Sequence, residues 1–118
     1  MAATKNPLLR LLHIRDEIDG IASALQGVSF AGYQHNYTLR RAAERAIQII
    51  SEAVRALPPE QLARFPETPW SAIIGIGNIL RHEYQHIDDK RLWEILDVHL
   101  PELRPVIVKM IAEFQRSA

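Results

Sequence analysis

WSAIIGIGNILRHEY, residues 70–84, has the residue spacing of an amphipathic helix. Ile73, Ile76 and Leu80 recur at steps of three and four residues, so they share one side of a helix and can face a core. Pro69 stands directly before this stretch and is typical of a first helical position. The sequence therefore predicts a helix that begins at Pro69 and ends at about the last residue of the stretch.

The same helical period extends on both sides of this stretch. It predicts further helices over residues 8–26, 36–57 and 88–100 and from 101 onward, with one short turn at 59–65. Pro105 lies early in the last segment, which leaves open whether the final two segments are separate helices or one kinked helix. No strand pattern or repeat interrupts them. We therefore expect an all-α, up-and-down bundle of four to five helices that forms a single domain over residues 1–118.

The composition excludes several classes of protein. The 118 residues include no cysteine, so disulfides and thiolate metal sites are excluded. Fourteen basic and 14 acidic residues cancel, so the strongly basic surface of a general nucleic-acid-binding protein is absent. No apolar run reaches the roughly 18 residues of a membrane span, and the N-terminus does not resemble a signal peptide. We expect a soluble, cytoplasmic protein.

A polar stripe, defined by Ser71, Gly75, Asn78 and His82, runs along the predicted helix. These residues are spaced four, three and four apart, so they lie on one side of it. Gly75 and its neighbour Gly77 each cost roughly 1 kcal/mol relative to alanine in a helix interior. Close approach of another backbone or of a ligand, for example in a dimer, is the simplest compensation. The stripe therefore suggests a helix that crosses beside a polar pocket.

His82 is the candidate catalytic residue of this stripe. Histidine gains and loses protons near neutral pH, so it can act as a general acid or base. Asn78, one turn earlier, can donate a hydrogen bond to the imidazole or to a substrate oxygen. Arg81 is rotated by about 100° from His82 and is expected beside the stripe rather than on it. The competing interpretation is that His82 is an ordinary surface or capping residue.

A metal site and a phosphate site are weaker candidates. His82 and His86 are four residues apart, a spacing that can bind zinc. No cysteine is present and no acidic third ligand is specified, so we expect neither a metal nor another cofactor. Arg41, Arg45 and Arg55 follow one another along the helix predicted for residues 36–57. They could contact phosphate, but ion pairs with glutamates of the same helix are the simpler interpretation.

Several short motifs follow one another between residues 8 and 114. They are GVSF (27–30), RAIQIISEA (45–53), PWSAIIGIGN (69–78), HEY (82–84), LWEIL (92–96) and LPEL (100–103). In this order and spacing the chain resembles the HepT-like branch of the HEPN superfamily. The resemblance implies a helical homodimer with active sites at its interface, acting as a metal-independent endoribonuclease toxin of a type VII toxin–antitoxin pair. It also implies a partner, a minimal nucleotidyltransferase antitoxin that adds AMP to a tyrosine (AMPylation).

The catalytic motif of this family is an arginine, four residues, a histidine, one residue and a tyrosine. His82 and Tyr84 match its end, and Asn78 matches the asparagine that follows the family's arginine. The resemblance thus implies that His82 and Asn78 are catalytic and that Tyr84 is the AMP acceptor. Gly77 stands in the place of the arginine.

Gly77 leads to two functional hypotheses. RNA cleavage without a metal needs a cation that stabilises the charged phosphorane, and loss of one such donor costs about 10²–10³ in rate. Either Arg81 or Arg45 supports His82 and the protein cleaves RNA, or the protein is a catalytically weakened or inactive HEPN-fold binding partner of a nucleotidyltransferase. We expect that restoring an arginine at position 77 would discriminate between them.

Overall fold

The computed structural model describes residues 6–82 and 87–117, and every element within these ranges is helical. The four long helices are α1 (Pro7–Ala24), α3 (Tyr37–Arg55), α5 (Trp70–His82) and α7 (Leu100–Ser117). The short elements are α2 (Phe30–Gln34), α4 (Pro59–Leu62), α6 (Asp89–Glu94) and the π-helical turn η2 (Ile95–His99). The predicted all-α bundle is therefore confirmed for the described part of the chain.

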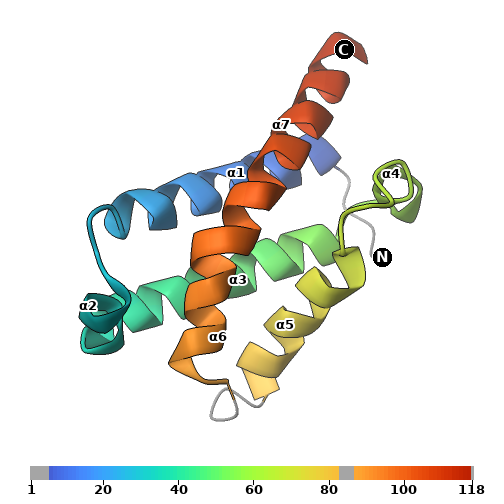
Figure 1. The fold of residues 1–118 in the computed structure, drawn as a ribbon. Coiled ribbons are helices and arrows are strands. Elements are labelled where there is room, and N and C mark those ends of the chain that lie inside the picture. Colours follow the sequence, from blue (N-terminus) through green and yellow to red (C-terminus); the bar gives the residue numbers. More distant parts are fainter. Residues whose placement is uncertain (1–5, 83–86, 118) are drawn as a thin grey trace.

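Helix α3 is the centre of the bundle. It packs against α1 on one side and α5 on the other, while α7 crosses α1 at a steep angle (Figure 1). Its inward residues are small or aliphatic, so neighbouring helices can approach it from both sides. These residues are Ala43, Ala46, Ile47, Ile50, Ala53 and Val54. One side of helix α5 is therefore packed on α3, and residues on a different side of α5 can form a functional site.

Polar side chains begin several of the helices. Asn6, Ser29, Asn36 and Asp88 each accept a hydrogen bond from the backbone N–H three residues later, which satisfies an otherwise unpaired donor. After α1 the chain turns at Gly27, whose φ of 77° is accessible to glycine at little cost. These local signals place the ends of the helices within a few residues of the predicted positions.

The final two predicted segments form one continuous helical rod from Asp89 to Ser117. Within it, the Leu100 N–H donates to the Ile95 carbonyl, five residues earlier. This wider turn lies directly before Pro101, which has no N–H to donate and whose ring would crowd the carbonyl four residues earlier. The structure thus favours one helix with a π-turn over two separate helices.

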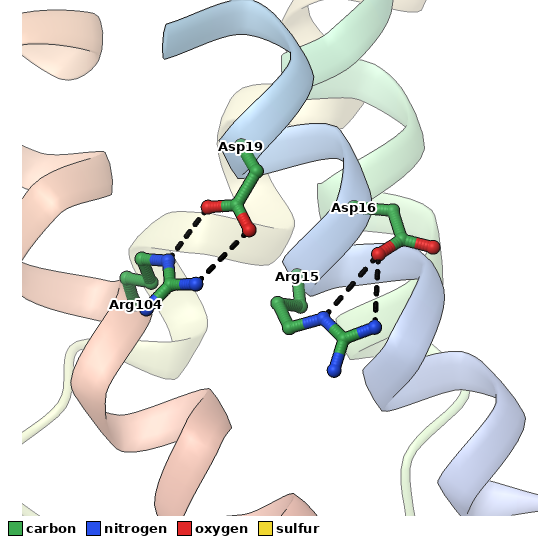
Figure 2. Close-up of polar contacts among 4 residues, drawn as sticks. All are labelled: Arg15, Asp16, Asp19 and Arg104. Atoms are coloured by element: carbon green, nitrogen blue, oxygen red, sulfur yellow. Dashed lines mark hydrogen bonds and ion pairs between the residues drawn. The ribbon is translucent and has the colours of Figure 1, made fainter. Parts of the chain in front are cut away.

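An ion pair joins α7 to α1 (Figure 2). The Arg104 Nε lies 2.6 Å from Asp19 Oδ1 and its Nη2 lies 3.0 Å from Asp19 Oδ2. The hydrogen bonds from Arg104 hold the pKa of Asp19 below its ordinary value. Arg15 pairs with Asp16 within α1, also shown in Figure 2. Both pairs are solvent-exposed, so each contributes little to the free energy of folding.

Among the described residues, no helix is long and apolar enough to cross a membrane.

Candidate active site

The crossing of α3 and α5 positions the candidate site. Gly77 is buried at this crossing, and a Cβ added to it would overlap the Cβ and Oγ of Ser51 in α3. The Ser51 hydroxyl donates a hydrogen bond of 2.9 Å to the Ile74 carbonyl of α5. A close contact between helices therefore explains Gly77, and it is made by the side chain of Ser51, because only glycine leaves room for the serine.

Gly75 differs from Gly77. A Cβ added to Gly75 would meet no atom within 4 Å among the described residues. Among the described residues, close packing therefore explains Gly77, and the expectation that another backbone or a ligand approaches Gly75 stays a prediction. Gly75 lies on the polar stripe, away from the crossing with α3.

Arg81 brings the predicted site residues together. Its Nη2 donates to Asn78 Oδ1 at 2.7 Å, and its Nε donates to His82 Nε2 at 3.3 Å. Its Nη1 reaches across to α3 and donates to Glu52 Oε2 at 3.2 Å. Arg81 thus starts from a position beside the stripe, as its spacing predicts, and its long side chain folds back over the preceding turn to reach the stripe residues. We call these four residues, Asn78, Arg81, His82 and Glu52, the Arg81 cluster.

The hydrogen bond between Arg81 and His82 places the imidazole directly beside a permanent positive charge. Arginine has only donors, so the Nε2 of His82 is the acceptor in this contact. An acceptor nitrogen is the kind of atom that takes up a proton in general-base catalysis. Both side chains are exposed, so a substrate can reach them.

Glu52 was not predicted as part of the site. A glutamate in the arginine-rich sequence of α3 suggested pairing within its own helix, and Arg41 does pair with Glu44 in this way, at 2.8 Å. Glu52 instead pairs with Arg81 across the two helices. The sequence signal that could have revealed this contact is the neighbouring Ser51. A small polar residue among the buried alanines and isoleucines of α3 indicates that another helix packs closely there.

The remaining predicted site residues are not joined to the Arg81 cluster. Arg45 lies on the exposed side of α3, and its Nη1 donates to Gln48 Oε1 at 3.4 Å. Tyr84 and His86 lie outside the described residues, so the modification site and the histidine pair are not described. Within residues 6–82 and 87–117, no group of three or more His, Asp or Glu side chains could hold a metal ion.

An apolar groove of about 490 Å³ lies on another side of α5. Neither Asn78, Arg81 nor His82 lines it, so it is separate from the candidate site. Its walls come from α3, α5, α6, η2, α7 and the segment just before α5, and most of its lining residues are aliphatic. They include Ile47, Ile73, Ile76, Ile95, Leu103 and Val106.

Comparison with known proteins agrees with this architecture. Residues 14–110 match the family model described as ribonuclease HepT-like. A protein of Caldanaerobacter subterraneus subsp. tengcongensis, provisionally named an RNase, is 32% identical over 107 residues, which cover 91% of this chain and 96% of the relative. A provisionally named RNase of Methanocaldococcus jannaschii is 30% identical over 94 residues, covering 80% and 86% of the two chains.

A third relative carries the family name itself. The probable ribonuclease HepT of Thermococcus cleftensis is 25% identical over 103 residues, covering 81% of this chain and 94% of the relative. No solved structure matches the chain. The family model spans most of the chain and the first of these relatives matches it along nearly its full length, so the chain belongs to the HepT-like ribonuclease family.

Proposed function

We propose that this protein is a metal-independent endoribonuclease in which His82 is the general base. Membership of a ribonuclease family supports RNA as the substrate. The observation that carries the mechanism is the hydrogen bond between Arg81 and His82, in which His82 Nε2 is the acceptor. An acceptor nitrogen beside a cation is suited to remove a proton from a group next to a phosphate.

The proposed reaction uses the ribose 2′-hydroxyl as the nucleophile. His82 Nε2 removes the 2′-OH proton while the 2′-oxygen forms a bond to the adjacent phosphorus. The bond between phosphorus and the 5′-oxygen breaks, and this oxygen leaves with the bonding electrons and takes up a proton from water, while His82 later returns its proton to the solvent. The products are a 2′,3′-cyclic phosphate and a 5′-hydroxyl. Asn78 orients the guanidinium next to the base, at 2.7 Å.

Cleavage of RNA in the presence of EDTA tests this proposal. We expect the purified protein to cut a labelled RNA into products that end in a 2′,3′-cyclic phosphate. A matched RNA carrying 2′-O-methyl groups should stay intact, because it lacks the nucleophile. Cleavage of the methylated RNA, or cleavage that requires a divalent cation, would contradict the mechanism.

We also propose that two copies of the chain pair through the polar stripe, which would place the active sites at the interface. Gly75 supports this, because no described residue packs against it, and a glycine inside a helix costs stability without a gain unless something else does. A second backbone packed on Gly75 would explain why alanine is not used there. Asn78 and His82 lie on the same stripe and would then face the partner.

Pairing of two copies through the polar stripe predicts that substitution by alanine has different effects at two glycines. Gly20→Ala, at an open position within α1, should raise the free energy of unfolding by about 0.5–1 kcal/mol. Gly75→Ala should lack this gain and should instead raise the Kd of the dimer at least tenfold, because its methyl group would separate the two helices. Analytical ultracentrifugation and urea denaturation measure both quantities. If Gly75→Ala stabilises like Gly20→Ala and leaves the assembly unchanged, the stripe is not the interface.

The protein is further proposed to be the cytoplasmic toxin of a type VII toxin–antitoxin pair. Its partner would be a minimal nucleotidyltransferase that neutralises it by AMPylation of Tyr84, two residues after His82. The added phosphate would repel RNA from the site, and the nucleoside would obstruct it. This proposal rests on the match of residues 82–84 to the family motif.

Mass spectrometry tests the modification. Incubation with the cognate nucleotidyltransferase and ATP should add the mass of AMP to the wild type and to Tyr37→Phe. Tyr37 is 64% exposed and serves as the control for a surface tyrosine. Tyr84→Phe should remain unmodified. Undiminished modification of Tyr84→Phe would place the acceptor elsewhere.

One observation favours a second function. Position 77 has no arginine, and its surroundings leave no space for one. The protein could thus have lost nuclease activity and serve as a binding partner of the nucleotidyltransferase. Wild-type protein that binds the nucleotidyltransferase but leaves RNA intact at micromolar concentration would establish this alternative.

A further inference from the structure

We propose that Arg81 supplies the cation that the family motif places at position 77, one helical turn further along α5. The inference rests on the proposed ribonuclease function and names the residue that stabilises the transition state. In the family motif the charged residue directly precedes the asparagine. Here the proposed charged residue follows the asparagine by three positions.

The geometry of the helix allows this relocation. Positions 77 and 81 are four residues apart, so their Cα atoms project within about 40° of each other and are separated by about 6 Å along the axis. Side chains in a helix lean toward its N-terminus. Arg81 follows this rule, since its guanidinium reaches back to Asn78. The charge therefore lies close to the turn from which an arginine at position 77 would project.

The packing shows why the charge cannot come from position 77 itself. Gly77 faces α3, and Ser51 occupies the space next to it. An arginine there would have to displace Ser51 and disrupt its hydrogen bond to the Ile74 carbonyl. Arg81 lies beyond this crossing, where its side chain is 35% exposed. A cation at position 81 is thus compatible with the close approach of α3 and α5.

The guanidinium is held in place and still has donors to offer. Three of its N–H groups are used, one each on Nε, Nη1 and Nη2, by His82, Glu52 and Asn78. Arginine has five, so with respect to residues 6–82 and 87–117 one further N–H remains on each terminal nitrogen. Two such donors match the two non-bridging oxygens of a phosphodiester. Glu52 and Asn78 act as positioning residues, because they orient the fork without touching the substrate.

Arg81 and His82 then act on neighbouring atoms of one nucleotide. The substrate 2′-hydroxyl replaces Arg81 Nε as the partner of His82 Nε2 and gives up its proton there. As the 2′-oxygen bonds to phosphorus, negative charge grows on the non-bridging oxygens beside the guanidinium. A preorganised charged donor at this place lowers the barrier, because its attraction is strongest in the transition state.

Three substitutions test the inference. Arg81→Ala should lower kcat for RNA cleavage by about 10²–10³-fold with a smaller change in KM. Arg81→Lys keeps the charge but loses the fork, so it should fall between alanine and wild type. Arg55→Ala, which removes an exposed arginine of α3 outside the cluster, should retain wild-type kcat. Thermal denaturation of each variant verifies that it is folded.

Chemical rescue distinguishes a cation that contacts the substrate from an Arg81 side chain with a purely structural role. Guanidinium ion at millimolar concentration should restore part of the activity of Arg81→Ala and none of that of His82→Ala. Wild-type kcat in Arg81→Ala, or a loss that guanidinium does not restore, would overturn the inference.

The failure of this inference can be separated from the failure of the proposed function. If His82→Ala is inactive while Arg81→Ala is fully active, the protein is a ribonuclease and the cation lies elsewhere. If the wild type itself does not cleave RNA, the proposed function fails, and binding of the 2′-O-methyl RNA tests Arg81 alone. Equal affinity of wild type and Arg81→Ala in that assay would overturn the inference as well.

Discussion

His82→Ala is expected to lower kcat for RNA cleavage by about 10²–10⁴-fold, the range that a general base contributes. The imidazole is the titratable base that lies next to the guanidinium fork, whereas the Glu52 carboxylate accepts a hydrogen bond from Arg81 Nη1 and is engaged in an ion pair with it. KM should change less, because proton removal takes place in the transition state. Initial rates on a short RNA with a single cleavage site measure both constants.

The matched control for this experiment is His13→Ala. His13 is an exposed histidine of α1, so its loss changes the surface in a similar way without touching the site. Its kcat should equal that of the wild type. A His82→Ala variant that cleaves at the wild-type rate would remove His82 from the mechanism.

Gly77→Arg is expected to lower the free energy of unfolding by about 2–4 kcal/mol. This range combines about 1–3 kcal/mol for an overpacked contact with about 1 kcal/mol for the lost hydrogen bond between Ser51 and Ile74. Urea denaturation followed by circular dichroism measures the change. The variant would therefore report on folding before it reports on catalysis, so a test of activity by restoring this arginine needs the stability measurement beside it.

A double-mutant cycle isolates the contact behind this effect. In the wild-type background, Gly77→Ala should destabilise by about 1–3 kcal/mol, because even a methyl group overlaps Ser51. In the Ser51→Gly background the same change should stabilise by about 1 kcal/mol, because alanine is the better helix former and the Ser51 Cα lies at an ordinary contact distance of 3.8 Å.

Gly20→Ala in α1 is the control for this cycle, and it should have the same effect in both backgrounds. An equal effect of Gly77→Ala in both backgrounds would show that Ser51 is not the reason for the glycine.

The helices and the position of the site could be predicted from local sequence patterns. The step of three and four residues in 70–84 is a property of one helix, and it placed Ile76 and Leu80 in the core as the structure has them. The same spacing placed Asn78 and His82 on one exposed side. These predictions needed only the geometry of a single α-helix, so they did not depend on how the helices cross.

The contacts that shape the site could not be predicted in this way. Glu52 and Arg81 are 29 residues apart, and their pairing depends on where α3 and α5 cross. The same crossing sets Ser51 against Gly77 and leaves Gly75 open, although the two glycines look alike in the sequence. Helical periodicity gives the direction in which a side chain leaves its own helix. It does not give the distance to a residue on another helix.

By itself, the sequence determined the helical class of this protein, its family and the residues of the polar stripe, because all of these depend on spacing along the chain. Only the tertiary structure decided that Gly77 accommodates Ser51 and that Arg81 joins Asn78 and His82. The physical reason is that van der Waals overlap and hydrogen bonding act over a few ångströms. Atoms come within that range across the bundle only when the helices have packed.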